Sequence, residues 1–141
     1  MALYEPKFKE NYGMIVRSAY NFGANFIATI GHRYRRDFQD TIDGTNHIPL
    51  FNFPDLDSFL VSIDKRCILV GVEVNGKIGL ESFSHPQNAC YIFGGEDRNL
   101  PDELLQQTSV KIDTKYCLNL AVTAGIIMWD RRLKQTQRTQ I

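Results

Sequence analysis

The stretch YIFGGEDRNLPDELL at Tyr91–Leu105 contains the first indication of the fold. It begins with an apolar run typical of a strand, the run ends on two glycines, and Glu96 follows at once. After Pro101, a residue suited to the first turn of a helix, the pattern becomes amphipathic. Two glycines after a strand indicate that a ligand or another chain segment approaches the backbone closely. The stretch therefore predicts a strand followed by a helix. Between them, a ligand or another chain segment is expected to approach the two glycines, with the carboxylate of Glu96 next to it.

Strands and helices alternate along the rest of the chain. The predicted strands are residues 1–6, 24–31, 66–74, 88–95 and 109–113, and the predicted helices are residues 11–22, 55–65, 100–107 and 117–135. Residues 32–54 are predicted to be irregular, and residues 75–79 to form a turn. Alternation without an internal repeat or linker predicts a single α/β domain over residues 1–141. Its sheet is predicted to be mostly parallel, with helices on both faces.

Capping residues indicate where the first two helices begin and end. Asn11 is a candidate N-cap, and Gly23 fits the position directly after the first helix. The second helix has a candidate N-cap in Asp55 or in Asp57.

Composition limits the kinds of partner that the protein can have. Apolar residues make up 43% of the 141 residues and charged residues 23%, as in an ordinary globular domain. The formal net charge is zero, so any nucleic-acid site must be a local basic patch. No apolar run approaches the roughly 20 residues of a membrane span, and the N-terminus lacks a secretory signal. We therefore expect a cytoplasmic protein without a membrane partner.

Cysteines and histidines show no pattern of metal ligands. The three cysteines form no CxxC pair, and two of them lie in strand-like runs where a buried, reduced thiol is usual: Cys67, Cys90 and Cys117. The three histidines are scattered over predicted loops: His32, His47 and His85. No metal site is predicted.

The last predicted helix is apolar around most of its circumference. A helix of this kind must be buried on nearly all sides. In a chain this short, one side could pack on the sheet and another on a second copy, so a homodimer is predicted. The apolar residues are Leu118, Leu120, Ala121, Val122, Ala124, Ile126, Ile127, Met128 and Trp129.

Three segments, in order, resemble the motifs of one family. NYGMIVRSAYNFGA at Asn11–Ala24 is similar to a first motif, N-x-G-x-x-x-R followed by F-G. Tyr91–Leu105 is similar to a second motif, F-G-x-E-x-x-G-L-P. VKIDTKYCLNLAVTAGIIMWD at Val110–Asp130 is similar to a third, an apolar strand followed by S-L-N-V-S and a helix rich in small residues. Over nearly the whole chain, the sequence resembles the SpoU/TrmH class of SPOUT methyltransferases.

The resemblance implies a function and a topology. Members of this class transfer a methyl group from S-adenosylmethionine to a ribose 2′-hydroxyl of tRNA or rRNA. The implied fold is an α/β domain with a C-terminal trefoil knot that acts as a homodimer, here without a separate RNA-binding extension. The knot is an exception to the rule that chains do not thread loops. The glycines after the strand are then expected to let the walls of the cofactor cleft approach the adenosine closely.

Four residues match the implied catalytic positions. Arg17 would activate the ribose hydroxyl across the dimer interface, although a guanidinium is a poor base and could instead polarise the hydroxyl while a phosphate takes the proton. Asn11 could position the arginine or substrate as well as cap a helix. Glu96 could fix the knot loop, pair with Arg17 or Asn119, or be an ordinary loop acid near a helix N-terminus. Asn119, in an otherwise apolar helix, needs a hydrogen-bond partner if buried, which favours a role in the site.

The implied cofactor site consists mainly of backbone groups and apolar side chains. No metal is needed, since alignment of the hydroxyl with the methyl carbon is the main catalytic task. The positions that match are Val72, Gly94, Gly95, Ile112, Cys117 and Leu118.

Departures from the motifs leave a second hypothesis open. Asn99 replaces a glycine, although asparagine tolerates a left-handed turn. Cys117 replaces a serine with a weaker hydrogen-bonding group, and Ala121 replaces a polar residue. The alternative is therefore a catalytically impaired RNA-binding protein of the same fold. An unrelated nucleotide-binding protein is disfavoured, since neither GxxxxGK[ST] nor GxGxxG is present.

Two clusters of basic residues are candidate RNA contacts. Clustered arginines beside Tyr34 could bind phosphates while the ring stacks on a base, and these are Arg33, Arg35 and Arg36. A second group in the last helix has an alternative interpretation as a cationic last turn that complements the helix dipole: Arg131, Arg132 and Lys134.

Overall fold

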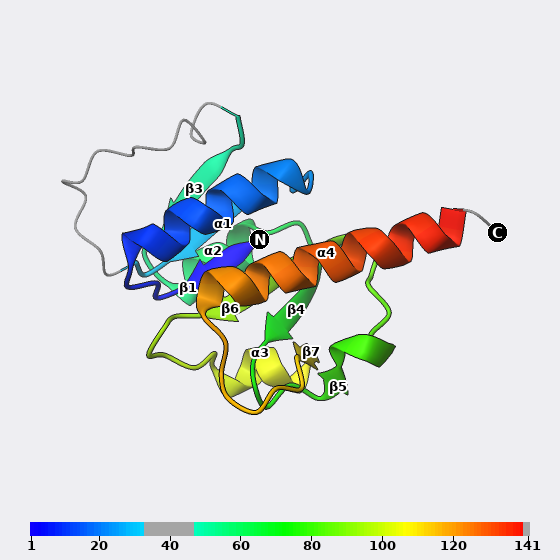
Figure 1. Ribbon diagram of the computed structural model, residues 1–141. Helices are drawn as coiled ribbons and strands as arrows, with labels where there is room; N and C mark the ends of the chain where they lie inside the picture. The colour runs from blue at the N-terminus through cyan, green and yellow to red at the C-terminus, as the bar shows by residue number, and fades with distance from the viewer. Residues whose placement is uncertain (33–46, 140–141) are drawn as a thin grey trace.

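The computed structural model describes residues 1–32 and 47–139 (Figure 1). The described strands form one seven-stranded sheet in the order β3-β2-β1-β6-β4-β7-β5, and each neighbouring pair is parallel. The strands are β1 (Ala2–Tyr4), β2 (Ile27–Ile30), β3 (Leu50–Phe53), β4 (Ile68–Val72), β5 (Ile78–Gly79), β6 (Ala89–Gly94) and β7 (Thr108–Lys111). The helices are α1 (Lys9–Asn21), α2 (Leu56–Ser62), the short 3-10 helix η2 (Leu80–Ser82), α3 (Asp102–Gln106) and α4 (Leu120–Thr139). The predicted parallel α/β sheet is confirmed.

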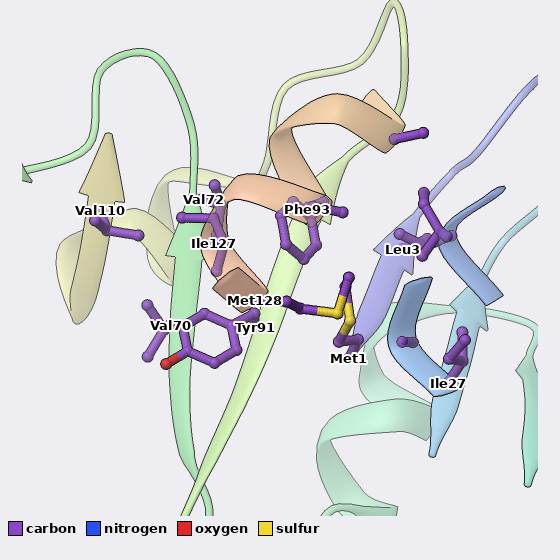
Figure 2. Packing of buried hydrophobic residues seen from close by; sticks show 14 of the residues in the cluster. Met1, Leu3, Ile27, Val70, Val72, Tyr91, Phe93, Val110, Ile127 and Met128 are labelled. Atoms are coloured by element: carbon purple, nitrogen blue, oxygen red, sulfur yellow. The ribbon is translucent and has the colours of Figure 1, made fainter. Parts of the chain in front are cut away.

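Helices cover both faces of the sheet, and each face has its own apolar core. On one face α1 and α4 pack side by side, and Figure 2 shows Ile127 and Met128 of α4 over strands β4 and β6. On the other face α2 and α3 contribute Phe59, Leu104 and Leu105. Central strands covered on both sides need apolar residues in sequence, and all four residues of β2 are buried. This explains why the central strands were recognisable as continuous apolar runs.

Both edge strands differ from the sequence-based prediction. Residues 50–53, expected to be irregular, form β3, and residues 78–79, expected to lie in a turn, form β5. Edge strands can be short and partly polar because only one neighbour completes their hydrogen bonds. The two central residues of β3 are exposed, and the Asn52 side chain accepts a hydrogen bond from the Thr29 hydroxyl at 2.5 Å. Neither strand therefore has an apolar run long enough to indicate it.

Helix α1 ends as predicted but begins earlier than predicted. Its N-cap is Phe8, which makes no side-chain cap bond, so the prediction that Asn11 is the N-cap is wrong. At the other end Gly23 has φ of 74°, its N–H donates to the carbonyl of Tyr20, and the N–H of Ala24 donates to that of Ala19. This paired pattern is the Schellman motif, which confirms the role of Gly23.

The other helix starts refine the predictions. Asp55, rather than Asp57, caps α2 and accepts a hydrogen bond from the N–H of Ser58 at 2.8 Å. Pro101 occupies the N-cap position of α3 instead of its first turn. Helix α4 starts at Leu120, later than predicted, because the side chain of Asn119 caps it.

A buried polar cluster holds the second half of α4 against the loop before β6. The His85 ring is almost fully buried, with Nδ1 2.5 Å from the Tyr91 hydroxyl and Nε2 2.7 Å from Asp130 Oδ2. Asp130 also forms an ion pair with Lys134 at 2.7 Å, and the Arg131 guanidinium donates to the Tyr91 hydroxyl at 3.1 Å. Burial lowers the pKa of His85, more than its contact with Asp130 raises it. A neutral imidazole satisfies both bonds, since Nε2–H donates to Asp130 and Nδ1 accepts from Tyr91.

Two of the basic residues in α4 have a structural role that was not predicted. Arg131 donates to the carbonyls of Pro86 and Gln87, and Lys134 to those of Leu80 and Phe83. The helix continues to Thr139, so the interpretation of this group as a last turn is wrong. These two cations bind loop carbonyls.

None of the helices in residues 1–32 and 47–139 is long and apolar enough to cross a membrane.

Candidate functional site

A cleft of about 220 Å³ lies at the carboxyl ends of β4, β6 and β7. In open parallel sheets this edge is where ligands usually bind. A larger hollow of about 570 Å³ lies at the opposite, amino edge, beside Met1 and Ala89. None of the predicted catalytic or cofactor residues lines it, although Arg131 and Arg132, two of the candidate RNA contacts, do. All six predicted cofactor positions line the cleft at the carboxyl edge: Val72, Gly94, Gly95, Ile112, Cys117 and Leu118.

Gly94 and Gly95 leave room for other parts of the protein. A Cβ on Gly94 would clash with the Glu73 carboxylate and the Arg98 carbonyl, and a Cβ on Gly95 would clash with the carbonyl of Glu5. Glu5 itself has a positive φ of 46°, an uncommon conformation for a residue with a side chain. Both glycines line the cleft, but the close approach they permit is between chain segments. That these glycines also let the walls of the cleft approach an adenosine stays a prediction.

Glu96 joins the second motif to the start of α1. Its carboxylate accepts hydrogen bonds from the N–H of Lys7 at 2.8 Å, the N–H of Phe8 at 3.1 Å and Nδ2 of Asn11 at 3.0 Å. It thus caps α1 from a distant part of the chain, where the helix dipole favours a negative charge. Burial acts to raise the pKa of Glu96, but these hydrogen bonds outweigh it and the pKa lies below its ordinary value. Glu96 makes no contact with Arg17, and it reaches Asn119 only through Asn11.

Asn119 continues this network to α4. Its Nδ2 donates to Oδ1 of Asn11 at 3.0 Å, and its Oδ1 accepts from the N–H of Ala121 at 2.8 Å and of Val122 at 3.3 Å. Asn119 is exposed and precedes the helix, so the expectation of a buried amide within an apolar helix is wrong. Its partners nevertheless place it beside the cleft, which Leu118 and Leu120 line.

Arg17 lies apart from the other three predicted catalytic residues. It is six positions beyond Asn11 on α1, about 9 Å along the helix axis. Its side chain is exposed, and within the described part of the chain its guanidinium forms no ion pair or hydrogen bond. Met14, one helical turn earlier, is also exposed. The side chain of Arg17 therefore points from the exposed face of α1 into solvent.

Glu73 is a site residue that the sequence analysis missed. It follows β4, lines the cleft and accepts a hydrogen bond at Oε1 from the N–H of Leu100 at 2.9 Å. Burial raises the pKa of Glu73, and hydrogen bonds from Leu100 and Val74 only partly offset this. A carboxylate directly after an apolar strand was the available signal, because carboxyl ends of parallel strands meet at one edge of the sheet.

The three residues that depart from the family motifs lie in different environments. Among described residues with a side chain, only Glu5 has a positive φ, so the expected left-handed conformation at Asn99 does not occur. Ala121 is buried in the core, where its N–H still donates to Asn119. Cys117 is exposed at the cleft, whereas Cys90 is buried within β6 and burial raises the pKa of its thiol.

Two further predictions fall outside what the structure can test. Arg33, Arg35 and Arg36 lie outside the described residues. Among residues 1–32 and 47–139, no three histidine, cysteine, aspartate or glutamate side chains converge in a way that could hold a metal ion.

Comparison with known proteins identifies the class and then the family. The chain has the same fold as RNA methyltransferases of known structure. The profile of the SpoU rRNA Methylase family matches residues 1–129, and the chain belongs to this family. The predicted family, the parallel α/β fold and the class of enzyme, an RNA methyltransferase, are thereby confirmed.

Several solved structures resemble the chain along nearly its whole length. A protein studied for the 2-OH methylation of C/U34 on tRNA has a TM-score of 0.83 and 23% identity, over 96% of this chain and 95% of that one. The methyltransferase AviRb from Streptomyces viridochromogenes, in complex with AdoMet, has a TM-score of 0.83 and 20% identity, over 96% of this chain and 60% of its own. A putative RNA methyltransferase from Bacillus anthracis has a TM-score of 0.78 and 21% identity, over 96% and 92%. Among curated proteins, no match to this chain was found.

Proposed function

We propose that this chain transfers a methyl group from S-adenosylmethionine to a ribose 2′-hydroxyl of RNA at the carboxyl-edge cleft. The observation that carries the proposal is the convergence of all six expected cofactor positions on this cleft, beside the Glu96–Asn11–Asn119 network. tRNA is the substrate that we favour, because a structure of nearly equal length comes from a protein that methylates tRNA.

The cleft has the chemical character that S-adenosylmethionine requires. Val72, Ile112 and Leu118 supply apolar surface for a purine ring, and Glu73 and Asp97 supply negative charge. When bound, S-adenosylmethionine supplies a methyl group on a positively charged sulfonium, which carboxylates at the cleft would stabilise. We infer that Glu73 also fixes the wall of the cleft, since its carboxylate holds the N–H of Leu100.

The hydrogen-bonded network would align the reacting groups. Glu96 fixes the start of α1, and Asn11 and Asn119 fix the start of α4 relative to it. Alignment of nucleophile and methyl carbon accounts for much of the rate of such a reaction, and a misplacement of about 1 Å can cost about a hundredfold. These residues therefore act as positioning residues in the proposal.

Arg17 would complete the site from a second copy of the chain. In this proposal its guanidinium contacts the ribose hydroxyl or the adjacent phosphate and orients them, since a guanidinium is a strong donor and a poor base. Arg17 lies on the exposed face of α1 beside Met14, and makes no ion pair within the described residues of its own chain. Without the partner copy, the proposed site lacks this residue.

The proposed homodimer interface consists of α1 and α4. Val122, Trp129 and Leu133 are exposed along α4 and form one stripe together with Gly125. Soluble proteins seldom leave such an apolar stripe uncovered. Because α1 packs beside α4, the stripe and Met14 belong to one continuous side of the molecule. We further infer a single cytoplasmic domain, with the C-terminal trefoil knot that the family resemblance implies.

The test begins with calorimetric titration of the purified chain with S-adenosylmethionine and then S-adenosylhomocysteine. We expect one site per protomer, followed by transfer of labelled methyl into tRNA and recovery of a 2′-O-methylated nucleoside. Arg17→Ala should abolish transfer and spare cofactor binding, whereas Arg66→Ala, at an exposed arginine on the opposite, amino edge of the sheet, should change neither. Cofactor binding without transfer to tRNA or rRNA would contradict the proposal and favour the catalytically impaired RNA-binding protein.

A further inference from the structure

Two exposed aromatic rings flank the cleft, and each is preceded in the chain by a lysine. Tyr116 is 76% exposed, and the ammonium of Lys115 lies 5.7 Å from its ring centroid. Phe8 is 49% exposed, and the ammonium of Lys7 lies 5.3 Å from its centroid. Tyr116 is therefore exposed over most of its surface and Phe8 over about half, so both rings are open to contact with a ligand.

The backbone of both residues is held beside the cleft. Tyr116 directly precedes Cys117, which lines the cleft, and its carbonyl accepts a hydrogen bond from the Thr114 hydroxyl at 2.8 Å. Phe8 donates its N–H to Glu96, which also lines the cleft. The rings are therefore held on two segments that border the same opening.

One hydrogen-bonded chain connects the two segments. Phe8 is bonded to Glu96, Glu96 to Asn11, and Asn11 to Asn119, which caps α4 shortly after Tyr116. The separation of the two segments that carry the rings is thus set by the network that positions the proposed reacting groups. A ligand that contacts both rings would therefore be held in a defined position relative to the cleft.

We propose that Tyr116 and Phe8 are stacking platforms for the bases next to the methylated nucleotide, and that Lys115 and Lys7 bind the adjoining phosphates. The ligand class is single-stranded RNA, because bases can stack on protein rings only when they are free of a duplex. The charges fit an anionic chain: Lys115 forms no ion pair among the described residues, and Lys7 has one with Asp97 at 3.1 Å. This inference rests on the proposed function and adds the substrate-recognition residues to it.

The first experiment measures the affinity for a labelled 12-nucleotide oligouridylate by fluorescence anisotropy at low salt. Stacking on one aromatic ring contributes to affinity by about fivefold to a hundredfold, so Tyr116→Ala should weaken binding by that factor. Tyr116→Phe keeps the ring and should bind like the wild type. Phe51→Ala is the matched control, since Phe51 is 50% exposed at the far edge strand of the sheet and should not affect the affinity.

The second experiment distinguishes stacking from a structural role of the ring. An abasic oligomer of the same length, which can stack on neither ring, should bind the wild type about as weakly as the uridylate binds the double variant Phe8→Ala/Tyr116→Ala. Tyr116→Ala should then cause no further loss of affinity for the abasic oligomer. Equal affinities of the wild type and Tyr116→Ala, or independent effects of removing the bases and of Tyr116→Ala, would overturn the inference. A dimer that dissociates in Tyr116→Ala, measured by light scattering, would also overturn it, because the ring would then be a subunit contact.

The outcome does not depend on methyl transfer. If the wild type binds the oligomer through Tyr116 but methylates neither tRNA nor rRNA, the stacking surface stands and the proposed reaction fails. If the wild type methylates RNA and Tyr116→Ala does so with unchanged KM, the reaction stands and the stacking surface fails.

Discussion

The two halves of α4 are held in contrasting ways (Figure 1). At its amino end the exposed Asn119 is hydrogen-bonded to the amide of Asn11, which in turn donates to the Glu96 carboxylate, so α4 itself is held there by a bond between two neutral amides. Further along, Asp130 binds a buried imidazole and an ammonium. Buried charged groups lose much more when a partner is removed than exposed amides do. The helix is thus anchored strongly away from the cleft and held by weaker contacts at the cleft, so stability and alignment can be changed separately.

The largest effect on stability is expected from removing the carboxylate of Asp130, in the second half of α4. Asp130→Ala leaves Nε2 of the buried His85 without its acceptor and removes the carboxylate that is paired with Lys134. We expect a loss of about 2–4 kcal/mol in the free energy of unfolding, measured by urea denaturation. Cofactor affinity at a temperature where the variant is folded should be unchanged. A large loss of cofactor affinity there would show that the two halves are not separable.

The next largest effect is expected at the amino end. Glu96→Gln keeps one acceptor oxygen but removes the charge that holds Lys7, Phe8 and Asn11. We expect a loss of about 1–2 kcal/mol in stability and a fall of about a hundredfold in kcat for methyl transfer. Glu10→Gln, on an exposed carboxylate in the first turn of α1, is the control and should lower kcat far less. Equal kcat values for the two variants would contradict the role of Glu96.

Asn119 allows capping and alignment to be separated. Asn119→Ala removes the cap of α4 and should cost about 1 kcal/mol of stability. Asn119→Ser can still cap the helix but cannot reach Asn11, so stability should recover while kcat stays low. Recovery of both in the serine variant would show that Asn119 acts only as a cap.

As pH falls, the second half of α4 should lose stability first and its amino end second. Because the folded pKa of His85 lies below its unfolded value, the stability it contributes is complete above about pH 6.5 and is lost as pH falls through the folded pKa. The pKa of Glu96 is also lowered, so its contribution persists to more acidic pH and is lost below its ordinary value of 4.5. The groups that face His85 are Tyr91, Asp130, Arg131 and Lys134. His85→Gln should flatten the dependence of Tm on pH between 6.5 and 5, and an unchanged slope would exclude His85 as its cause.

The smallest effect is expected on the exposed stripe of α4. A Cβ on Gly125 would meet no atom within 4 Å in a single chain. Gly125→Ala should therefore stabilise an isolated protomer by about 0.5–1 kcal/mol, through better helix propensity. In a dimer that packs through this stripe, the same change should raise the dissociation constant, measured by analytical ultracentrifugation. Stabilisation without any change in association would place the interface elsewhere.

Sequence patterns predicted the centre of the sheet better than its edges or the site. Central strands are apolar because both faces are covered, whereas β3 and β5 are short and gain only one neighbour each. The motifs correctly grouped Asn11, Glu96 and Asn119, but periodicity could not reveal that Glu96 caps α1. A cap supplied from another part of the chain leaves no local pattern, so Asn11 was taken for the N-cap. The role of Gly95 could not be seen in the local sequence either, because the segment packed against it is the turn at Glu5, about 90 positions earlier in the chain.

The hydrogen bonds of the site also determine when it can form during folding. Asn11 and Glu96 are 85 positions apart, and Asn11 and Asn119 are 108 apart. Contacts between distant positions form late, since the intervening chain must be closed into a loop before they contribute any stability. Each described strand ends at or before Lys111. A nascent chain that has emerged only as far as Leu118 therefore contains all the strands that the structure describes and still lacks the residue that joins α4 to α1.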